Sequence, residues 1–302
     1  NKNFFFGGSM KPLFALVVLH YKTWWDTIEC VDSMLATNYS NKHIIIVNND
    51  EDEVSQKKLA ERYHTDPQIT LLKTGKNLGF SRGNNLGFQH AKYELKASFI
   101  VLSNNDIVLP DDNIIDDIID KYRETPFDIL GPKIISNVDQ LDQNPRDELY
   151  DSISNVKKFI SNFRWLLWLS YLKIDLSLVS WKKKIFPISK LPSYNTDLDH
   201  ETEQWEVKLH GSFLVFASNY IEQYEGLYPI KTMQLEESIL NFIAKRDNLR
   251  TVYFPSSKVY HKEDSATNYV YGKGVKKRRF YYRNCLASCK ELLKLMKNEN
   301  KK

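Results

Sequence analysis

Strand-like and helix-like segments alternate along the first part of this 302-residue chain, up to Ile135. Segments with apolar residues at helical spacing, such as residues 24–35, lie between short apolar runs that are typical of buried strands. The runs cover residues 13–19, 43–47, 69–72, 99–102 and 127–130. Strands that are separated by helices usually pair in parallel. The chain is therefore predicted to be an α/β protein with a doubly wound, mostly parallel sheet.

One predicted strand runs directly into a polar cluster that ends in a carboxylate. Residues 99–102 are followed by Ser103, Asn104, Asn105 and Asp106. Ligands of open α/β sheets bind at the carboxyl ends of the strands, and a divalent cation that bridges diphosphate oxygens needs a carboxylate there. We interpret Asp106 as the ligand of a metal that faces a nucleotide-sugar diphosphate. The alternative is that residues 104–106 only turn the chain and cap the next helix.

Two more polar segments are predicted at the same edge of the sheet. Asn48 and Asn49 follow the second strand, and the loop at residues 79–85 is rich in glycine and side-chain amides. The first strand is not followed by GxGxxG, and the chain has no GxxxxGK[ST], which argues against a Rossmann dinucleotide site and a P-loop. A site for a nucleoside diphosphate, held through a metal and side chains, is the remaining prediction.

Composition sets wider limits. The net charge of +4 is too small to indicate a nucleic-acid partner. Three cysteines form neither a disulfide framework nor a metal-ligand spacing, which is typical of the reducing cytoplasm. No apolar run is long enough to span a bilayer, and residues 1–10 are expected to be the remnant of an expression tag.

Several short motifs stand in a fixed order along the chain. The most specific is Asn-Leu-Gly-Phe at residues 77–80, followed by Gly-Asn-Asn at residues 83–85. The others lie at residues 17–21, 47–49, 104–106, 211–216, 236–237, 261 with 265–267, and 282–284. With these motifs, residues 13–286 resemble the family 2 glycosyltransferases of the GT-A fold, and among them the rhamnosyltransferase-like bacterial branch. Asn48 and Asn104 depart from the family, which usually has Asp at both positions.

The resemblance implies a role for each matching residue. Glu237 would be the catalytic base, with Glu236 as the second candidate, and Asp106 and His261 would bind a divalent metal, Mg²⁺ or Mn²⁺. Gly211 and Ser212 would lie on the acceptor side. The donor, a UDP- or dTDP-sugar, would be bound by His20, Tyr21, Asn48, Asn49, Asn77, Gly79, Arg82, Gly83, Asn84, Asn104 and Asn105.

The implied reaction is an inverting single displacement. An acceptor hydroxyl attacks the anomeric carbon, so it needs a base to take its proton, and the departing diphosphate needs a metal to neutralise its charge. The acceptor would be a glycan or a polyprenyl-linked glycan in bacterial surface polysaccharide synthesis.

Other interpretations remain open. The protein could be a catalytically degenerate GT-A scaffold or, on weaker grounds, a sugar-phosphate nucleotidyltransferase. The Glu236–Glu237 pair could be the charged first turn of a helix, His261 a structural histidine at a strand end, and the loop at residues 79–85 a plain connector.

The chain is divided, as an expectation, into a nucleotide-sugar-binding half at residues 11–135, a divergent insertion at 136–205, an acceptor and catalytic half at 206–270, and a basic amphipathic helix at 271–302. The insertion places apolar residues at helical spacing near three tryptophans, and residues 155–190 carry eight basic residues and one acidic residue. This pattern is typical of an interfacial helix on an anionic membrane, and it predicts a cytoplasmic protein bound peripherally to the inner face of the plasma membrane. Packing in the core or in a dimer is the alternative. The residues are Val156, Phe159, Ile160, Phe163 and Leu167, with Trp165, Trp168 and Trp181.

Overall fold

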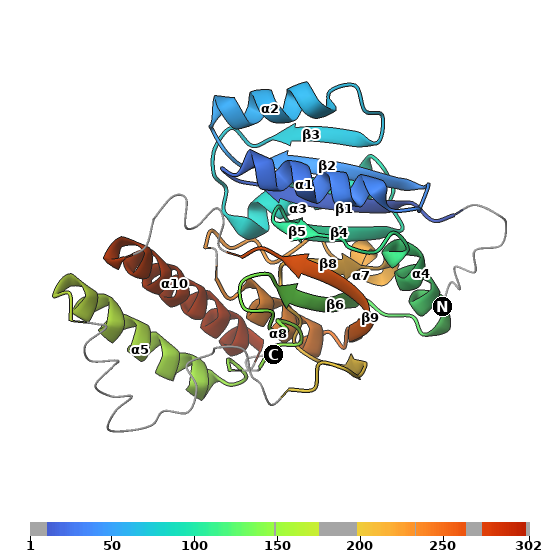
Figure 1. Ribbon diagram of the computed structural model, residues 1–302. Coiled ribbons are helices and arrows are strands. Elements are labelled where there is room, and N and C mark those ends of the chain that lie inside the picture. The colour runs from blue at the N-terminus through green and yellow to red at the C-terminus, as the bar shows by residue number, and fades with distance from the viewer. Residues whose placement is uncertain (1–10, 148, 175–197, 233, 264–273, 300–302) are drawn as a thin grey trace.

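The protein is described by a computed structural model that covers residues 11–147, 149–174, 198–232, 234–263 and 274–299. Its described residues form a mixed sheet in the order β3-β2-β1-β4-β8-β6-β9-β5, with β7 paired to β9 (Figure 1). The strands are β1 (Phe14–His20), β2 (Lys42–Asn48), β3 (Ile69–Lys73), β4 (Phe99–Asn104), β5 (Ile107–Val108), β6 (Ile129–Ser136), β7 (Gln204–Trp205), β8 (Phe213–Phe216) and β9 (Thr251–His261).

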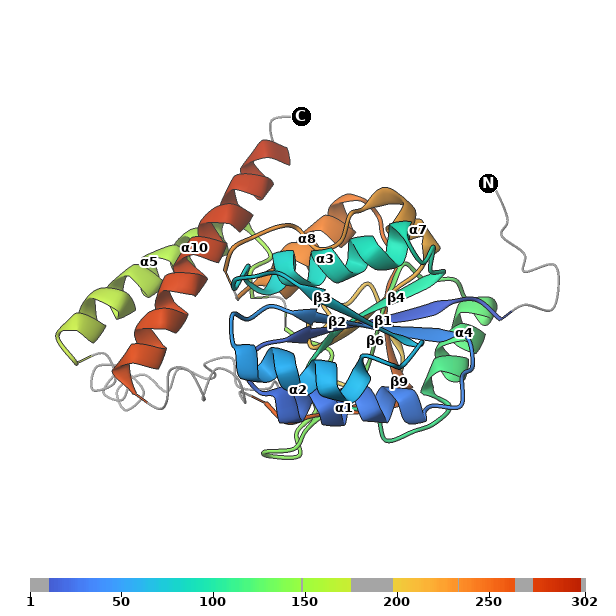
Figure 2. The same cartoon turned by 90° about the horizontal axis from the view of Figure 1, so that it is seen from above.

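Helices cover both faces of this sheet. In Figure 2, α1 (Trp24–Ala36) and α2 (Glu53–Tyr63) lie on one face, and α3 (Phe80–Tyr93), α7 (Ser218–Gln223) and α8 (Glu236–Arg246) on the other. Helix α4 (Ile114–Glu124) packs on the α1 side through its isoleucines. The remaining helices are α5 (Ile153–Tyr171) and α10 (Val275–Glu299). The predicted α/β fold with a mostly parallel sheet is confirmed.

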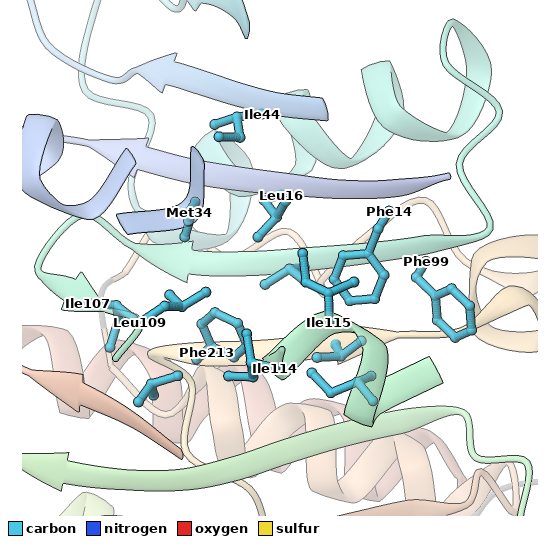
Figure 3. Packing of buried hydrophobic residues seen from close by; sticks show 14 of the residues in the cluster. Phe14, Leu16, Met34, Ile44, Phe99, Ile107, Leu109, Ile114, Ile115 and Phe213 are labelled. Atoms are coloured by element: carbon cyan, nitrogen blue, oxygen red, sulfur yellow. The ribbon is translucent and has the colours of Figure 1, made fainter. Parts of the chain in front are cut away.

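The parallel half of the sheet aligns the polar strand ends. Strand β1 pairs in parallel with both β2 and β4, in a register that sets His20 beside Asn48 and Leu19 beside Asn104. Side chains alternate between the two faces of a strand, so Leu16 enters the α1–α2–α4 core that Figure 3 shows, whereas Val17 enters the opposite core. The apolar runs are continuous because helices cover both faces.

The second half of the sheet brings distant segments to the same edge. Strand β8 is antiparallel to its neighbours β4 and β6, and β9 is parallel to β6. The two-residue strand β5 is antiparallel to β9, which sets Ile107 opposite His261. The sequence predicted two short strands at residues 251–254 and 259–261, but the structure has one strand with a register shift opposite Pro132 and Lys133. Pro255 has no N–H for the ladder, and such an irregularity accommodates it.

Helices α5 and α10 lie side by side beyond the carboxyl ends of the parallel strands (Figures 1 and 2). The apolar stripe that the sequence placed on a membrane faces inward: Val156, Ile160 and Phe163 are buried in a cluster with residues of α8 and α10. For this stripe the core alternative is the right one. Trp165 and Trp168 lie on the opposite side of α5 and are exposed, and Trp181 lies outside the described residues. Within the described residues, no helix combines the length and hydropathy that crossing a bilayer requires.

Candidate active site

Asp106 and His261 meet where β5 pairs with the end of β9. The Oδ1 atom of Asp106 lies 3.3 Å from Nε2 of His261, and both residues are buried. The backbone carbonyl of Asp106 accepts a hydrogen bond of 3.0 Å from the Lys262 N–H, which fixes the turn after β4 against β9. Asp106 and His261 are 155 positions apart in the sequence, and the pairing of β5 with β9 brings them together.

Gln143 determines which ring nitrogen of His261 carries the proton. The Gln143 amide nitrogen donates to the Glu263 carboxylate, which can only accept, so the amide oxygen faces Nδ1 of His261 at 2.7 Å. Nδ1 is then the donor to Gln143, and Nε2 of the ring faces Oδ1 of Asp106. Oδ1 of Asp106 accepts no hydrogen bond from the described residues. A divalent cation placed between them could be held by both Oδ1 and Nε2.

The spacing of the Asp106–His261 pair fits two adjacent ligands of a divalent metal. Adjacent ligands about 2.1 Å from an octahedral ion are about 3 Å apart, close to the separation of Oδ1 and Nε2. No cluster of three or more His, Cys, Asp or Glu side chains suited to a metal occurs in the described part of the chain. Mg²⁺ is usually held by one or two protein carboxylates together with substrate phosphates, so a cage built by the protein alone is not required.

Glu237 lies in the first turn of α8 and is held by the turn before β8. Its Oε1 accepts a hydrogen bond of 2.8 Å from the Gly211 N–H, and its Oε2 lies 3.8 Å from Nε of Arg146. Burial by itself raises the pKa of this carboxyl, but Arg146 and the other groups around it outweigh burial and lower the pKa to about 2. Glu237 is therefore an ionised carboxylate at neutral pH, held in a fixed orientation.

Glu236 is placed differently from its neighbour. Its Oε2 atom is buried and makes no hydrogen bond with the described residues. Burial, followed by the charge of Glu237, raises the pKa of Glu236 to about 7. Both glutamates pack on Gly211, where an added Cβ would lie 3.2 Å from Cγ of Glu237, so a side chain at this glycine would crowd the pair.

The turn at residues 210–212 joins Glu237 to the Asp106–His261 pair, the candidate metal site that we call the metal corner. Its three backbone N–H groups donate in succession to Asn144 Oδ1, Glu237 Oε1 and Nδ1 of His210 itself. Burial lowers the pKa of His210 to about 3, so its ring is neutral at neutral pH. The centroids of the His210 and His261 rings are 5.7 Å apart, which places Glu237 and Asp106 on the two sides of one histidine pair.

A cavity borders Glu237 and extends toward α10. Its lining includes Gln143, Arg146, Tyr150, Lys208, Glu237 and Tyr281. Gln143 also holds His261, so the cavity and the metal corner adjoin each other. Aromatic side chains beside charged and amide groups are suited to a polar ligand with apolar faces, such as a sugar.

Asn49 organises the glycine-rich loop that the sequence analysis assigned to donor binding. Its Oδ1 accepts from the Leu78 N–H at 2.9 Å, and its Nδ2 donates to the Gly79 carbonyl at 3.2 Å. Asn77 Oδ1 accepts from the Gly79 N–H. Gly79 has φ of +84° and lies against the Lys231 carbonyl, a position that only glycine fills without strain. The loop therefore has a defined conformation, which is held by hydrogen bonds to the residue that directly follows β2.

Other predicted donor residues have structural partners. His20 is fully buried, and its Nδ1 lies 2.7 Å from the Thr27 hydroxyl. The Asn105 amide donates to the hydroxyls of Thr23 and Thr27. Gly83 allows α3 to approach β1, since an added Cβ would lie 2.6 Å from Cδ1 of Leu19. These three residues contact other parts of the protein, so their role is to hold the elements around the site in place.

The remaining predicted donor residues divide by environment. Arg82 is exposed and points to the Pro229 carbonyl, and Asn84 is buried in α3. Tyr21 and Asn104 are half-buried at the strand ends. The Asn48 Nδ2 atom is buried and donates to no described group. Ser212 is buried, and its Oγ makes no hydrogen bond within the described residues.

Sequence reasoning missed four residues of this site. Gln143, Arg146 and Lys208 come from segments interpreted as polar and turn-rich or left without a role, and His210 precedes the matched glycine. Their types carry no local signal, because polar residues in loops are common. Only the pairing of β8 and β9 with β6 brings them to Glu237 and His261.

Comparison with known proteins agrees with this geometry. The sequence model described as glycosyl transferase family 2 matches residues 16–180, more than half of the chain. This chain belongs to glycosyl transferase family 2. No curated protein matches its sequence.

Solved structures confirm the fold of this family 2 protein. The crystal structure of residues 1–349 of TarS from S. aureus matches with a TM-score of 0.53 and 11% identity, over 85% of this chain and 63% of that one. The mannosyltransferase PcManGT from Pyrobaculum calidifontis, solved in complex with GDP-Man and Mn²⁺, matches with a TM-score of 0.52 and 11% identity. That match covers 94% of this chain and 74% of the mannosyltransferase. This chain thus spans less than two thirds of the TarS fragment.

Proposed function

We propose that this family 2 glycosyltransferase transfers a sugar from a nucleoside-diphosphate donor to a glycan by an inverting single displacement. The observation that carries the proposal is the arrangement around the two histidines. A carboxylate and an imidazole at a spacing suited to a cation lie on one side, and an ionised glutamate that lines a cavity lies on the other. Such an arrangement separates a group that binds the leaving diphosphate from a group that receives a proton.

The donor diphosphate is proposed to bind at the edge formed by β1, β2 and β4. Asp106 Oδ1 and His261 Nε2 would hold Mg²⁺ or Mn²⁺, which neutralises charge on the leaving diphosphate when bound. The mannosyltransferase of similar fold was solved with GDP-Man and Mn²⁺, which supports this class of ligand. We propose a UDP- or dTDP-sugar, with the Asn48 amide at the end of β2 facing the base or ribose.

Glu237 is the proposed base for the acceptor hydroxyl. Geometry supports Glu237 over Glu236: Glu237 lines the cavity, whereas Oε2 of Glu236 is buried without a partner among the described residues. The Gly211 N–H orients the Glu237 carboxylate and Arg146 keeps it ionised. It accepts the hydroxyl proton as the new bond to the anomeric carbon forms, on the face opposite the leaving group.

The acceptor is proposed to be a glycan on a polyprenyl carrier, as in the rhamnosyltransferase-like branch of bacterial surface polysaccharide synthesis. The cavity beside Glu237 reaches Tyr150 and Tyr281, and Tyr281 belongs to α10, which supports an acceptor that arrives from the side of the α5–α10 pair. A cytoplasmic protein, bound peripherally at the inner face of the plasma membrane, would meet such an acceptor.

A panel of nucleotide sugars tests the proposal. UDP-, dTDP- and GDP-sugars are each incubated with the protein and Mn²⁺, and release of the nucleoside diphosphate is measured. Release from one donor, lost in EDTA and in Asp106→Asn, is the expected result. Activity that EDTA leaves unchanged would remove the metal from the reaction, and no release from any donor would favour the scaffold alternative.

A further inference from the structure

The α5–α10 pair carries an exposed aromatic surface at one end. Trp165, Trp168, Tyr171 and Leu172 are each more than half exposed, at 60%, 56%, 52% and 52%. The two tryptophan rings are 5.6 Å apart. They lie on the face of α5 opposite Val156, Ile160 and Phe163, which are buried against α8 and α10. Tryptophans left exposed beside a completed core have no role in that core.

Basic residues surround this aromatic surface. Residues 161–174 and 274–284, the parts of the two helices nearest the tryptophans, together contain seven lysines and arginines and no aspartate or glutamate. Two of the arginines hold the helix ends together: Arg279 donates to the Ser170 carbonyl at 2.7 Å, and Arg283 donates to the Tyr171 hydroxyl at 2.5 Å. The guanidinium of Arg279 also lies over the Tyr171 ring at 4.4 Å. The end of the pair is therefore a rigid, positively charged unit.

We propose that this end of the α5–α10 pair, which we name the aromatic tip (Trp165, Trp168, Tyr171, Leu172), docks on an anionic lipid surface. Tryptophan and tyrosine rings partition to the boundary between headgroups and acyl chains, and the surrounding lysines and arginines attract anionic lipids. A second copy of the chain is a poor occupant, because two surfaces of the same charge repel each other. The positive charge around the tip therefore favours an anionic lipid surface over a second copy of the chain.

The position of the tip gives the docking a purpose, which rests on the proposed function. Tyr281, on the same helix pair, lines the cavity that contains Glu237. Helix α10 therefore runs from the tip to the acceptor cavity. A lipid-linked acceptor could keep its chain in the bilayer while its sugar reaches Glu237, whereas an acceptor without a lipid would gain nothing from the tip.

Vesicle sedimentation without donor, metal or acceptor tests the docking separately from catalysis. Wild-type protein should pellet with phosphatidylcholine–phosphatidylglycerol vesicles, be released by high salt, and stay soluble with phosphatidylcholine alone. The double variant Trp165→Ser, Trp168→Ser should bind at least about tenfold more weakly, since binding scales with the apolar area inserted. Removing one charge, as in Lys276→Gln, should weaken binding about fivefold.

Trp25→Ser serves as the matched control, because Trp25 is 44% exposed and belongs to α1, not to the α5–α10 pair. This variant should sediment as the wild type does. Wild-type protein that stays soluble with anionic vesicles, or a double variant that pellets equally, overturns the proposal. A wild-type dimer in analytical ultracentrifugation that the double variant loses, without vesicle binding by either, would assign the tip to self-association instead. Transfer to a lipid-free acceptor should be unchanged in the double variant.

Discussion

At the scale of single residues, the two adjacent glutamates of α8 have opposite environments. Glu237 accepts the Gly211 N–H and faces Arg146, whereas Glu236 is buried beside that negative charge. Glu237→Gln keeps the size and the hydrogen bond but removes the basicity. We expect kcat to fall by roughly a hundredfold or more, as for loss of a general base, with the Kd for the donor nucleotide unchanged in a titration.

The matched variant Glu236→Gln should keep most of the activity. An inactive Glu236→Gln beside an active Glu237→Gln would reverse the assignment. The pH profile of kcat/KM gives a second check. With the Glu237 pKa held low, activity should persist below pH 6, whereas a base with the pKa of Glu236 would lose activity as pH falls through about 7.

Glu236 should also make the stability of the fold depend on pH. Its pKa is about 7 in the folded protein, against an ordinary value of 4.5. The group is therefore best tolerated when protonated, and stability is lost as pH rises from about 4.5 through 7. Glu236→Gln removes this loss, which is on the order of 3 kcal/mol for a shift of this size. The variant should have a Tm several degrees above wild type at pH 8 and nearly equal to it at pH 4.5; equal Tm values at pH 8 would contradict the buried placement.

Gln143 is the residue whose role depends on one hydrogen bond. It fixes the tautomer of His261, and loss of such a second partner weakens metal affinity by about 10- to 100-fold. We expect Gln143→Leu to weaken Mn²⁺ binding by that factor in an electron paramagnetic resonance titration with UDP present. The exposed Gln140→Leu variant is the control, and Tm values show that both variants fold. Unchanged Mn²⁺ affinity in Gln143→Leu would show that the Gln143 amide does not contribute to metal binding.

How far the sequence predicted the site can be judged from these residues. Asp106, His261 and Glu237 were found because the resemblance assigned each of them to a short motif. Gln143, Arg146 and His210 were not found, because their importance arises from contacts across 27 to 118 residues. Sequence periodicity describes neighbours along the chain, and it carries no information on which loop meets which strand end.

At the scale of helices and strands, sequence patterns predicted most elements and failed where tertiary contacts decide. The first four strands match their apolar runs to within one or two residues, except that β4 continues into the polar cluster. The sequence pattern correctly predicted that the stripe on α5 is helical, but it did not predict that α8 and α10 cover the stripe. An amphipathic face has the same spacing of apolar residues whether it meets lipid or another helix. Only the position of α10 in the structure shows that a helix covers the stripe.

Close packing of α3 on the sheet gives a test at this scale. A Cβ on Gly87 would lie 2.3 Å from Cγ1 of Val17 and 2.8 Å from Cγ2 of Val47. Gly87→Ala improves helix propensity by about 1 kcal/mol, yet overpacking costs about 1–3 kcal/mol. We expect a net loss of stability in urea denaturation. In a Val17→Ala background the same substitution should cost less, because the valine methyls are gone; an equal cost in both backgrounds would contradict the packing.

At the scale of the whole molecule, one continuous sheet connects the expected donor and acceptor halves. Strand β4 pairs with β1 on one side and β8 on the other, so the division expected at residue 135 is not a gap in the sheet. The small β5–β9 ladder brings the end of β9 to the segment that follows β4. The metal corner lies at this closure. A ligand bound there contacts both halves and should stabilise the fold as a unit.

This linkage predicts the thermal behaviour of the protein. A ligand at a hundred times its Kd stabilises the folded state by about 2.7 kcal/mol, which corresponds to roughly 4 °C in Tm at this size. Wild-type protein should show such a shift with UDP and Mn²⁺ together, and a smaller one with UDP alone. Asp106→Asn should lose the part that depends on Mn²⁺, because the amide removes the negative charge that faces His261. The exposed Asp112→Asn should retain it. A full Mn²⁺-dependent shift in Asp106→Asn would show that the metal binds elsewhere, and not between Asp106 and His261.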